Sequence, residues 1–179
     1  MQFEEKLNAA KFSKLLTAKK YNEISKLAIN VETKTNLLFS FEIMALRDAI
    51  KAKGAKLFAE GLFDYIYGDK NMEDRFEKFA QLLSVLPRRQ TRVRTWPLQT
   101  IFGFIARPKE FIFLKPRVTQ KAAEAYGYDF IYESKPNWKT YQSLMGFVKQ
   151  IKKDIADLKP RDMIDVQSFI WVMGSDEYV

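Results

Sequence analysis

The sequence contains neither histidine nor cysteine. Without these residues the chain cannot build a Ser-His-Asp triad, a Cys-His pair, a two-histidine iron site or an ordinary zinc site. It also cannot form a disulfide bond, which favours a reducing compartment. The remaining options for catalysis are a carboxylate-held Mg²⁺ or Mn²⁺ ion, a carboxylate pair, or acid–base chemistry by lysine or tyrosine.

Phosphate-binding loops and membrane segments are missing as well. No GxxxxGK[ST] or GxGxxG motif occurs, so the phosphate cradles of nucleotide hydrolases and dinucleotide-dependent enzymes are absent. No apolar run approaches the ~18–20 residues of a membrane span. The acidic pair Glu4-Glu5 lies where a secretory signal has basic residues. We therefore expect a soluble, cytoplasmic protein with no membrane partner.

Turn-forming residues are scarce, with only 7 Gly and 6 Pro in 179 residues. A β-sandwich or barrel needs turn signals at short, regular intervals, so this scarcity favours long helices. The hydrophobic content of 47% is enough for a substantial core. We predict a mainly α fold in which residues 1–179 form a single helical domain.

Three amphipathic patterns predict the main helices, at residues 71–86, 137–158 and 162–173. In the first two, apolar residues recur at steps of three and four. The third is apolar almost all the way round, so we expect it in the middle of the domain. The predicted N-cap is Asn71 or Asp69 for the first helix, Asn137 for the second and Asp162 for the third.

Two short apolar segments are more typical of extended chain. Residues 110–115 lie between Pro108 and Pro116, and residues 128–133 alternate apolar and polar side chains. These patterns predict a small two-stranded β element. A wholly helical reading explains the sequence nearly as well.

Positive charge is concentrated in one stretch of the sequence. Residues 86–121 contain nine of the 30 basic residues and only one of the 22 acidic ones, so this segment accounts for the whole net charge of +8. Six of the nine are arginines, whose guanidinium groups bind phosphate in a bidentate manner and stack on bases. The pattern predicts a noncatalytic protein that binds DNA or RNA, without a cofactor. The predicted binding residues are Arg88, Arg89, Arg92, Arg94, Trp96, Arg107, Lys109, Lys115 and Arg117.

Other interpretations of the same residues stay open. The arginines could form a solvated loop or pair with acidic residues elsewhere, or they could bind a protein or an anionic lipid. An accessory subunit that docks on a larger protein would also explain the many aromatic residues and the lack of a complete catalytic set. Trp96, Trp138 and Trp171 are more typical of a core than of a stacking surface. Only Trp96, two residues after Arg94 and directly before Pro97, also fits a surface role.

A carboxylate-metal-dependent enzyme is the third alternative. Asp162 and Asp165 are three residues apart, a spacing that could hold Mg²⁺ on one face of a helix. Helix capping explains both residues more simply.

The second half of the chain contains several distinctive sequence motifs. Among them are Thr95-Trp-Pro97, Phe113-Leu-Lys-Pro116 and Pro160-Arg-Asp-Met-Ile-Asp-Val-Gln-Ser-Phe-Ile-Trp171. This half resembles a recurrent segment of uncharacterised bacterial proteins. The resemblance implies a common fold and assigns no activity and no catalytic residue.

Overall fold

The computed structural model describes residues 2–87 and 92–176. Within these ranges the chain is mainly helical, as predicted. The helices are α1 (Gln2–Leu7), α2 (Ala9–Thr17), α3 (Tyr21–Glu32), α4 (Ser40–Ala49), α5 (Ala55–Tyr67), α6 (Met72–Val85), α7 (Trp96–Ala106), α8 (Pro116–Tyr126), α9 (Trp138–Asp154) and α10 (Met163–Gly174). An irregular turn, η1 (Ile50–Gly54), joins α4 to α5, and a short 3₁₀ turn, η2 (Ala156–Leu158), follows α9. No helix in these ranges is both long enough and apolar enough to cross a membrane.

The predicted N-caps Asn137 and Asp162 are confirmed, and of Asn71 and Asp69 it is Asn71 that caps α6. The side chain of Asn71 accepts a hydrogen bond from the backbone N–H of Asp74 at 2.8 Å, and the side chain of Asn137 accepts one from Thr140 at 2.9 Å. Asp162 accepts a bond from Ile164 at 2.8 Å. These bonds satisfy donors that a helix start otherwise leaves unpaired, which is why α6, α9 and α10 begin close to the predicted positions.

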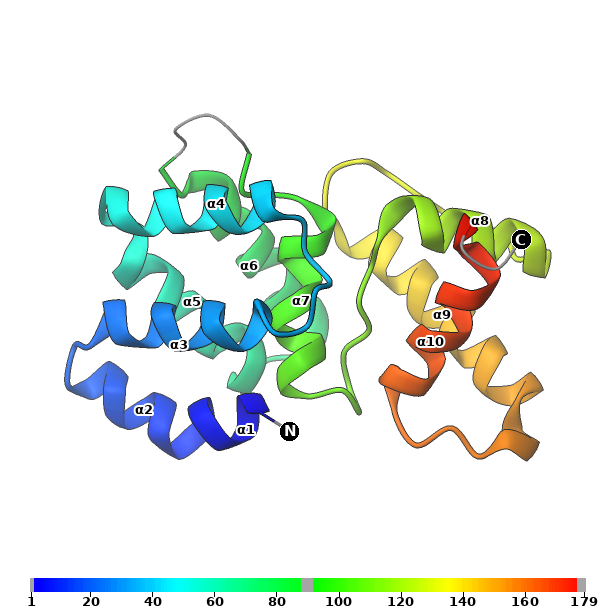
Figure 1. The fold of residues 1–179 in the computed structure, drawn as a ribbon, viewed down its shortest axis with the longest axis horizontal. Helices are drawn as coiled ribbons and strands as arrows, with labels where there is room; N and C mark the ends of the chain where they lie inside the picture. Colours follow the sequence, from blue (N-terminus) through cyan, green and yellow to red (C-terminus); the bar gives the residue numbers. More distant parts are fainter. Residues whose placement is uncertain (1, 88–91, 177–179) are drawn as a thin grey trace.

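The helices form two groups that meet along the middle of the molecule (Figure 1). Helices α1 to α7 form one group, with α7 at its edge nearest the second group, and α8 to α10 form the second group (Figure 1). Helix α10 packs on α8, and α9 contacts both α6 and α10. Phe76 on α6 and Tyr141 on α9 stack with their ring centroids 4.6 Å apart, so an aromatic contact connects the two groups.

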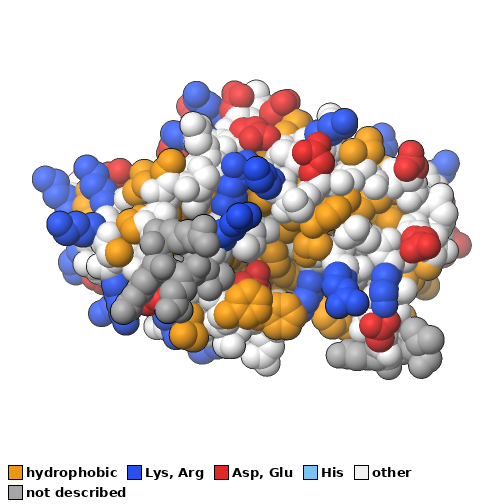
Figure 2. All heavy atoms as spheres, turned by 90° about the horizontal axis from the view of Figure 1, so that it is seen from above, with side chains coloured by type: hydrophobic (Ala, Val, Ile, Leu, Met, Phe, Trp, Pro, Cys, Tyr) orange, Lys and Arg blue, Asp and Glu red, His pale blue; other side chains and the backbone are white. Residues whose placement is uncertain are grey.

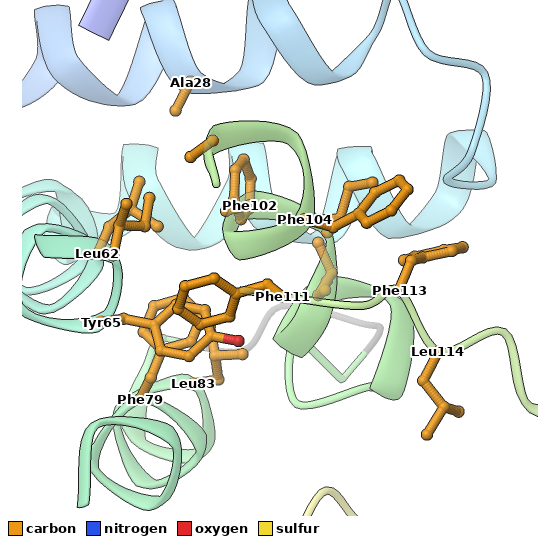
Figure 3. Packing of buried hydrophobic residues seen from close by; sticks show 14 of the residues in the cluster. Ala28, Leu62, Tyr65, Phe79, Leu83, Phe102, Phe104, Phe111, Phe113 and Leu114 are labelled. Carbon is orange, nitrogen blue, oxygen red and sulfur yellow. The ribbon is translucent and has the colours of Figure 1, made fainter. Parts of the chain in front are cut away.

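Aromatic side chains fill much of the core. The rings of Tyr65 and Phe79 stack 4.5 Å apart, and the edge of Phe111 meets Tyr65 at 5.1 Å (Figure 3). Gly103 allows this packing, because a Cβ atom there would lie 2.5 Å from the Phe111 ring. The buried hydrophobic residues described here join in one cluster that includes residues of both helix groups.

Helix α10 is less central than predicted. Its contact with α8 is close, because a Cβ atom on Gly174 would lie 2.0 Å from the carbonyl oxygen of Val118. Its other side reaches the surface, where Ile164 is 39% and Val172 53% exposed. Only part of its apolar circumference is therefore covered by α8 and α9.

The predicted two-stranded β element is wrong, since the structure shows no strand in residues 110–115 or 128–133. The first segment is extended and buried, but a side chain satisfies its backbone. The hydroxyl of Tyr141 accepts a bond from the Ile112 N–H at 3.1 Å and donates one to the Ile112 carbonyl at 3.3 Å. The Thr100 hydroxyl on α7 accepts a further bond from the Leu114 N–H at 3.0 Å. Side-chain hydroxyls thus make the hydrogen bonds that a neighbouring strand would make.

The second segment is satisfied in the same way along α9. The N–H of Ile131 donates to the Ser143 hydroxyl, and the N–H of Glu133 donates to the Thr140 hydroxyl, both at 3.0 Å. Both extended segments therefore bond α9, and the first also bonds Thr100 on α7, instead of pairing with each other.

Candidate nucleic-acid interface

An open groove of about 770 Å³ lies between the start of α4 and the helix pair α8 and α10. Phe39, Phe41 and Glu42 contribute one side of the groove, while Lys115, Arg117 and Trp171 line the other. Figure 2 shows one face of the molecule, on which hydrophobic side chains gather near the lower edge with basic side chains beside them. The groove combines exposed aromatic rings with cations.

The aromatic part of the groove is a stacked phenylalanine pair. Phe39 is the extended residue before α4, and Phe41 is the second residue of that helix. Their ring centroids are 5.5 Å apart with an interplanar angle of 12°, and the two residues are 53% and 52% exposed. The adjacent Leu38 is buried, so it anchors the chain while the two rings stay at the surface.

Lys115 connects the two sides of the groove. Its ammonium nitrogen lies 4.5 Å from the ring centroid of Phe39 and 5.0 Å from that of Trp171. Both distances suit cation–π attraction. Lys115 therefore places a positive charge directly against the exposed phenylalanine pair.

Glu42 fixes the base of the groove. Its carboxylate accepts hydrogen bonds from the Phe39 N–H at 3.1 Å and from the Thr95 hydroxyl at 3.2 Å. Burial raises the pKa of the Glu42 carboxyl, while these two bonds and the charge of Lys115 act in the opposite direction. The carboxylate thus ties the start of α4 to the start of α7.

Two further cations lie on α8. Arg117, in its first turn, is exposed. Lys121, one turn further on, forms an ion pair with Asp176, and this pairing lowers the pKa of the Asp176 carboxyl. Arg117 is consequently better placed than Lys121 to receive an anion from outside.

The structure brings together only part of the predicted basic segment. Lys115 and Arg117 lie in the groove. Arg92 is exposed and Arg94 is half-buried, where its guanidinium donates to the Pro136 carbonyl at 2.6 Å. Both arginines shortly precede Thr95, which also lines the groove. The predicted residues Arg88 and Arg89 lie outside the described ranges.

Trp96 is not a surface residue, so its predicted role in stacking is wrong for this structure. It is 1% exposed, and its indole N–H donates to the Glu133 carbonyl at 2.7 Å. Its ring packs in the core, 6.1 Å from the ring of Phe76. A base cannot reach a ring in this position.

Arg107 and Lys109 lie at the opposite end of α7 from Arg92 and Arg94. A helix of this length spans roughly 16 Å. Arg107 is also used internally, because it forms an ion pair with Glu110 and donates to the Ile66 carbonyl at 3.1 Å. The predicted segment is therefore continuous in sequence but divided in space.

The carboxylates considered for metal binding serve structural roles. Asp162 caps α10, and Asp165 forms an ion pair with Arg161 and accepts a bond from its backbone N–H at 2.8 Å. The Arg161 side chain lowers the pKa of Asp165 to about 2. In the part of the chain that the structure describes, no group of three or more acidic side chains could hold a metal ion.

A second hollow, of about 600 Å³, lies along α5 and α6, but its charges are mixed. Lys78 forms an ion pair with Asp64, and Arg75 donates to the backbone carbonyls of Tyr65 and Ile66 at 3.0 and 3.2 Å. These internal contacts make it a weaker candidate than the groove.

The aromatic part of the groove was not predicted from the sequence. Phe39 and Phe41 lie more than 70 residues before Lys115 in the sequence, outside the basic segment. The signal that could have revealed them is a pair of phenylalanines on either side of a serine at a helix start, where both rings cannot enter the core. No known family model, curated protein or solved structure matches the chain.

Proposed function

We propose that this protein binds nucleic acid without catalysing a reaction on it, and that the groove between α4 and α8 is the binding site. The observation that supports this proposal is the exposed Phe39–Phe41 pair beside Lys115 and Arg117 in one groove. Basic side chains attract the phosphate backbone, and aromatic side chains accept bases. The two kinds of contact are available within the same groove.

Arg92 extends this surface. Arg92 is three residues before Thr95, which lines the groove, so even a fully extended chain keeps their Cα atoms within about 11 Å. Arg92 is exposed and can follow the backbone of a strand that leaves the groove. Arg107 and Lys109, at the far end of α7, are not part of the proposed surface.

The test is a salt titration of binding to nucleic acid. Replacing Arg92 and Arg117 together by Ala should weaken binding, and each phosphate contact that is lost should reduce the slope of log K against log salt by about 0.7–0.9. Lys109→Ala is the matched control, because it removes an exposed cation at the other end of α7 and should leave the slope unchanged. Equal affinity and slope for the double variant and the wild type would contradict the proposal.

Docking on a protein is the second candidate function. It is favoured by Met44, which is 60% exposed on the same helix as the phenylalanine pair, so the start of α4 has an extended apolar surface. Copurification of a stoichiometric protein partner, together with an absence of bound nucleic acid before a high-salt wash, would support this candidate instead.

A further inference from the structure

The phenylalanine pair keeps part of its hydrophobic surface exposed to water in the folded protein. Phe39 and Phe41 each keep about half of their surface exposed, although the core contains many buried rings. Their planes differ by only 12°, so the pair offers flat faces of nearly the same orientation. A flat aromatic ligand could stack on such a pair and remove part of this surface from water.

A nucleic-acid base has this shape, but its faces are accessible only in certain states. In a duplex, neighbouring base pairs cover both faces, and proteins contact the base edges and the phosphates instead. In a single strand the bases can splay apart and stack on aromatic side chains. The phenylalanine pair therefore favours unpaired bases.

The size of the groove agrees with this preference. Its volume of about 770 Å³ is in the range of sites that enclose small ligands. Such a space accommodates individual nucleotides, whereas a duplex would have to lie across its opening.

The positions of the cations add the phosphate contacts that a strand requires. The ammonium group of Lys115 lies 4.5 Å from the Phe39 ring centroid, so the phosphate next to a stacked base comes close to a positive charge. Arg117 follows two residues later on the same side of the groove. Both cations lie opposite the start of α4, which carries the rings.

We infer that the groove binds single-stranded nucleic acid, with an unpaired base stacked on the Phe39–Phe41 pair and the adjacent phosphates held by Lys115 and Arg117. This inference rests on the proposed nucleic-acid binding and adds the form of the ligand. It assigns base contacts to α4 and phosphate contacts to α8.

Fluorescence anisotropy with three labelled probes tests the inference. The probes are a homothymidine strand of about ten nucleotides, an abasic strand of the same length, and a duplex of the same length. The wild-type protein should bind the homothymidine strand more tightly than the other two. Phe39→Ala and Phe41→Ala should each weaken binding of this strand by about tenfold and leave the weaker abasic binding unchanged.

The controls separate stacking from folding. Phe41→Tyr keeps an aromatic ring and should retain wild-type affinity, while Met44→Ala removes an exposed apolar side chain from the same helix and should have no effect. Circular dichroism spectra should show that all variants keep the helical fold.

The outcomes distinguish the two proposals. Equal affinity for strand, abasic strand and duplex, with no effect of the phenylalanine variants but weaker binding by Arg117→Ala, would overturn single-strand stacking and leave nucleic-acid binding intact. Binding of none of the three probes at low salt would overturn both.

Discussion

At the scale of single residues, the buried carboxyl of Glu42 is the feature with the clearest measurable effect. Glu42 is 4% exposed, and burial raises its pKa from the ordinary value. Glu32, at the end of α3, is 1% exposed, and its pKa is raised by burial and further by the charge of Glu42. The fold therefore contains two neighbouring carboxyls that bind protons more readily than in the unfolded chain.

The sign of the pH effect follows from these shifts. A group whose pKa is higher in the folded state stabilises the fold increasingly as pH falls through that pKa, and this contribution is lost again as pH rises. The chain has no histidine, so no side chain with an ordinary pKa titrates between about pH 5 and pH 7. Carboxyls with a raised pKa, such as Glu42, contribute to changes of stability in this window.

We expect the wild-type protein to become more stable as pH falls from about 7 to about 5. Glu42→Gln should reduce this increase in stability, because the amide of Gln has no proton to gain as pH falls. The amide can still form hydrogen bonds with Phe39 and Thr95. Urea unfolding at both pH values measures the effect. Glu124→Gln, at an exposed position, is the control. If Glu42→Gln had the same pH dependence of stability as the wild type, Glu42 would not be the source of the effect.

At the scale of secondary-structure elements, the extended segment before α8 is held by side-chain hydrogen bonds, two of them from Tyr141 and one from Thr100. Both backbone groups of Ile112 bond the Tyr141 hydroxyl on α9. This hydroxyl holds in place a buried segment that has no neighbouring strand.

Tyr141→Phe should destabilise the protein by about 1–3 kcal/mol, because it leaves a buried N–H and a buried carbonyl without their partner. Urea unfolding of the purified variant gives this value. Tyr67→Phe provides the comparison, since the Tyr67 hydroxyl makes one hydrogen bond, to the Leu7 carbonyl, and its loss should destabilise the protein less. Equal stability of Tyr141→Phe and wild type would mean that these two bonds do not hold the segment.

The same elements show what the sequence could and could not predict. Helix positions follow from local signals, the apolar spacing and the capping side chains Asn71, Asn137 and Asp162, so α6, α9 and α10 were predicted closely. Residues 110–115 have a strand-like composition, but their partner is a phenol on a distant helix. A strand and an extended segment satisfied by side chains have the same local pattern, so composition cannot separate them.

The candidate site was predicted only in part, for a related reason. Charge is visible in a linear sequence, and Lys115 and Arg117 were included in the predicted set. Whether a cation is exposed depends on tertiary contacts, such as the ion pair that engages Arg107. The rings of Phe39 and Phe41 join the site only because the fold places the start of α4 across the groove from the start of α8.

At the scale of the whole molecule, the aromatic contact between α6 and α9 joins the two helix groups. Phe76 is fully buried, and its ring lies 4.6 Å from that of Tyr141 and 5.8 Å from that of Trp138, both on α9. It also approaches Trp96 at the start of α7. Stability should therefore be shared across both groups.

Phe76→Ala should lower the free energy of unfolding by about 3–5 kcal/mol, because it removes a large buried side chain and leaves a cavity. Urea unfolding followed by circular dichroism and by tryptophan fluorescence should give coincident transitions at a lower midpoint than in the wild type. Phe63→Ala, at a half-buried ring on α5 away from α9, is the comparison and should cost less. Two separated transitions in the wild type would show that the groups unfold independently.

The groove, like the stability of the fold, depends on both helix groups. Its rings belong to the part of the chain before residue 50, whereas its cations and Trp171 belong to the part after residue 110. Neither portion alone would carry a complete recognition surface. A ligand that contacts both sides of the groove binds the folded protein and not the unfolded chain. Such a ligand should therefore raise the free energy of unfolding of the whole molecule.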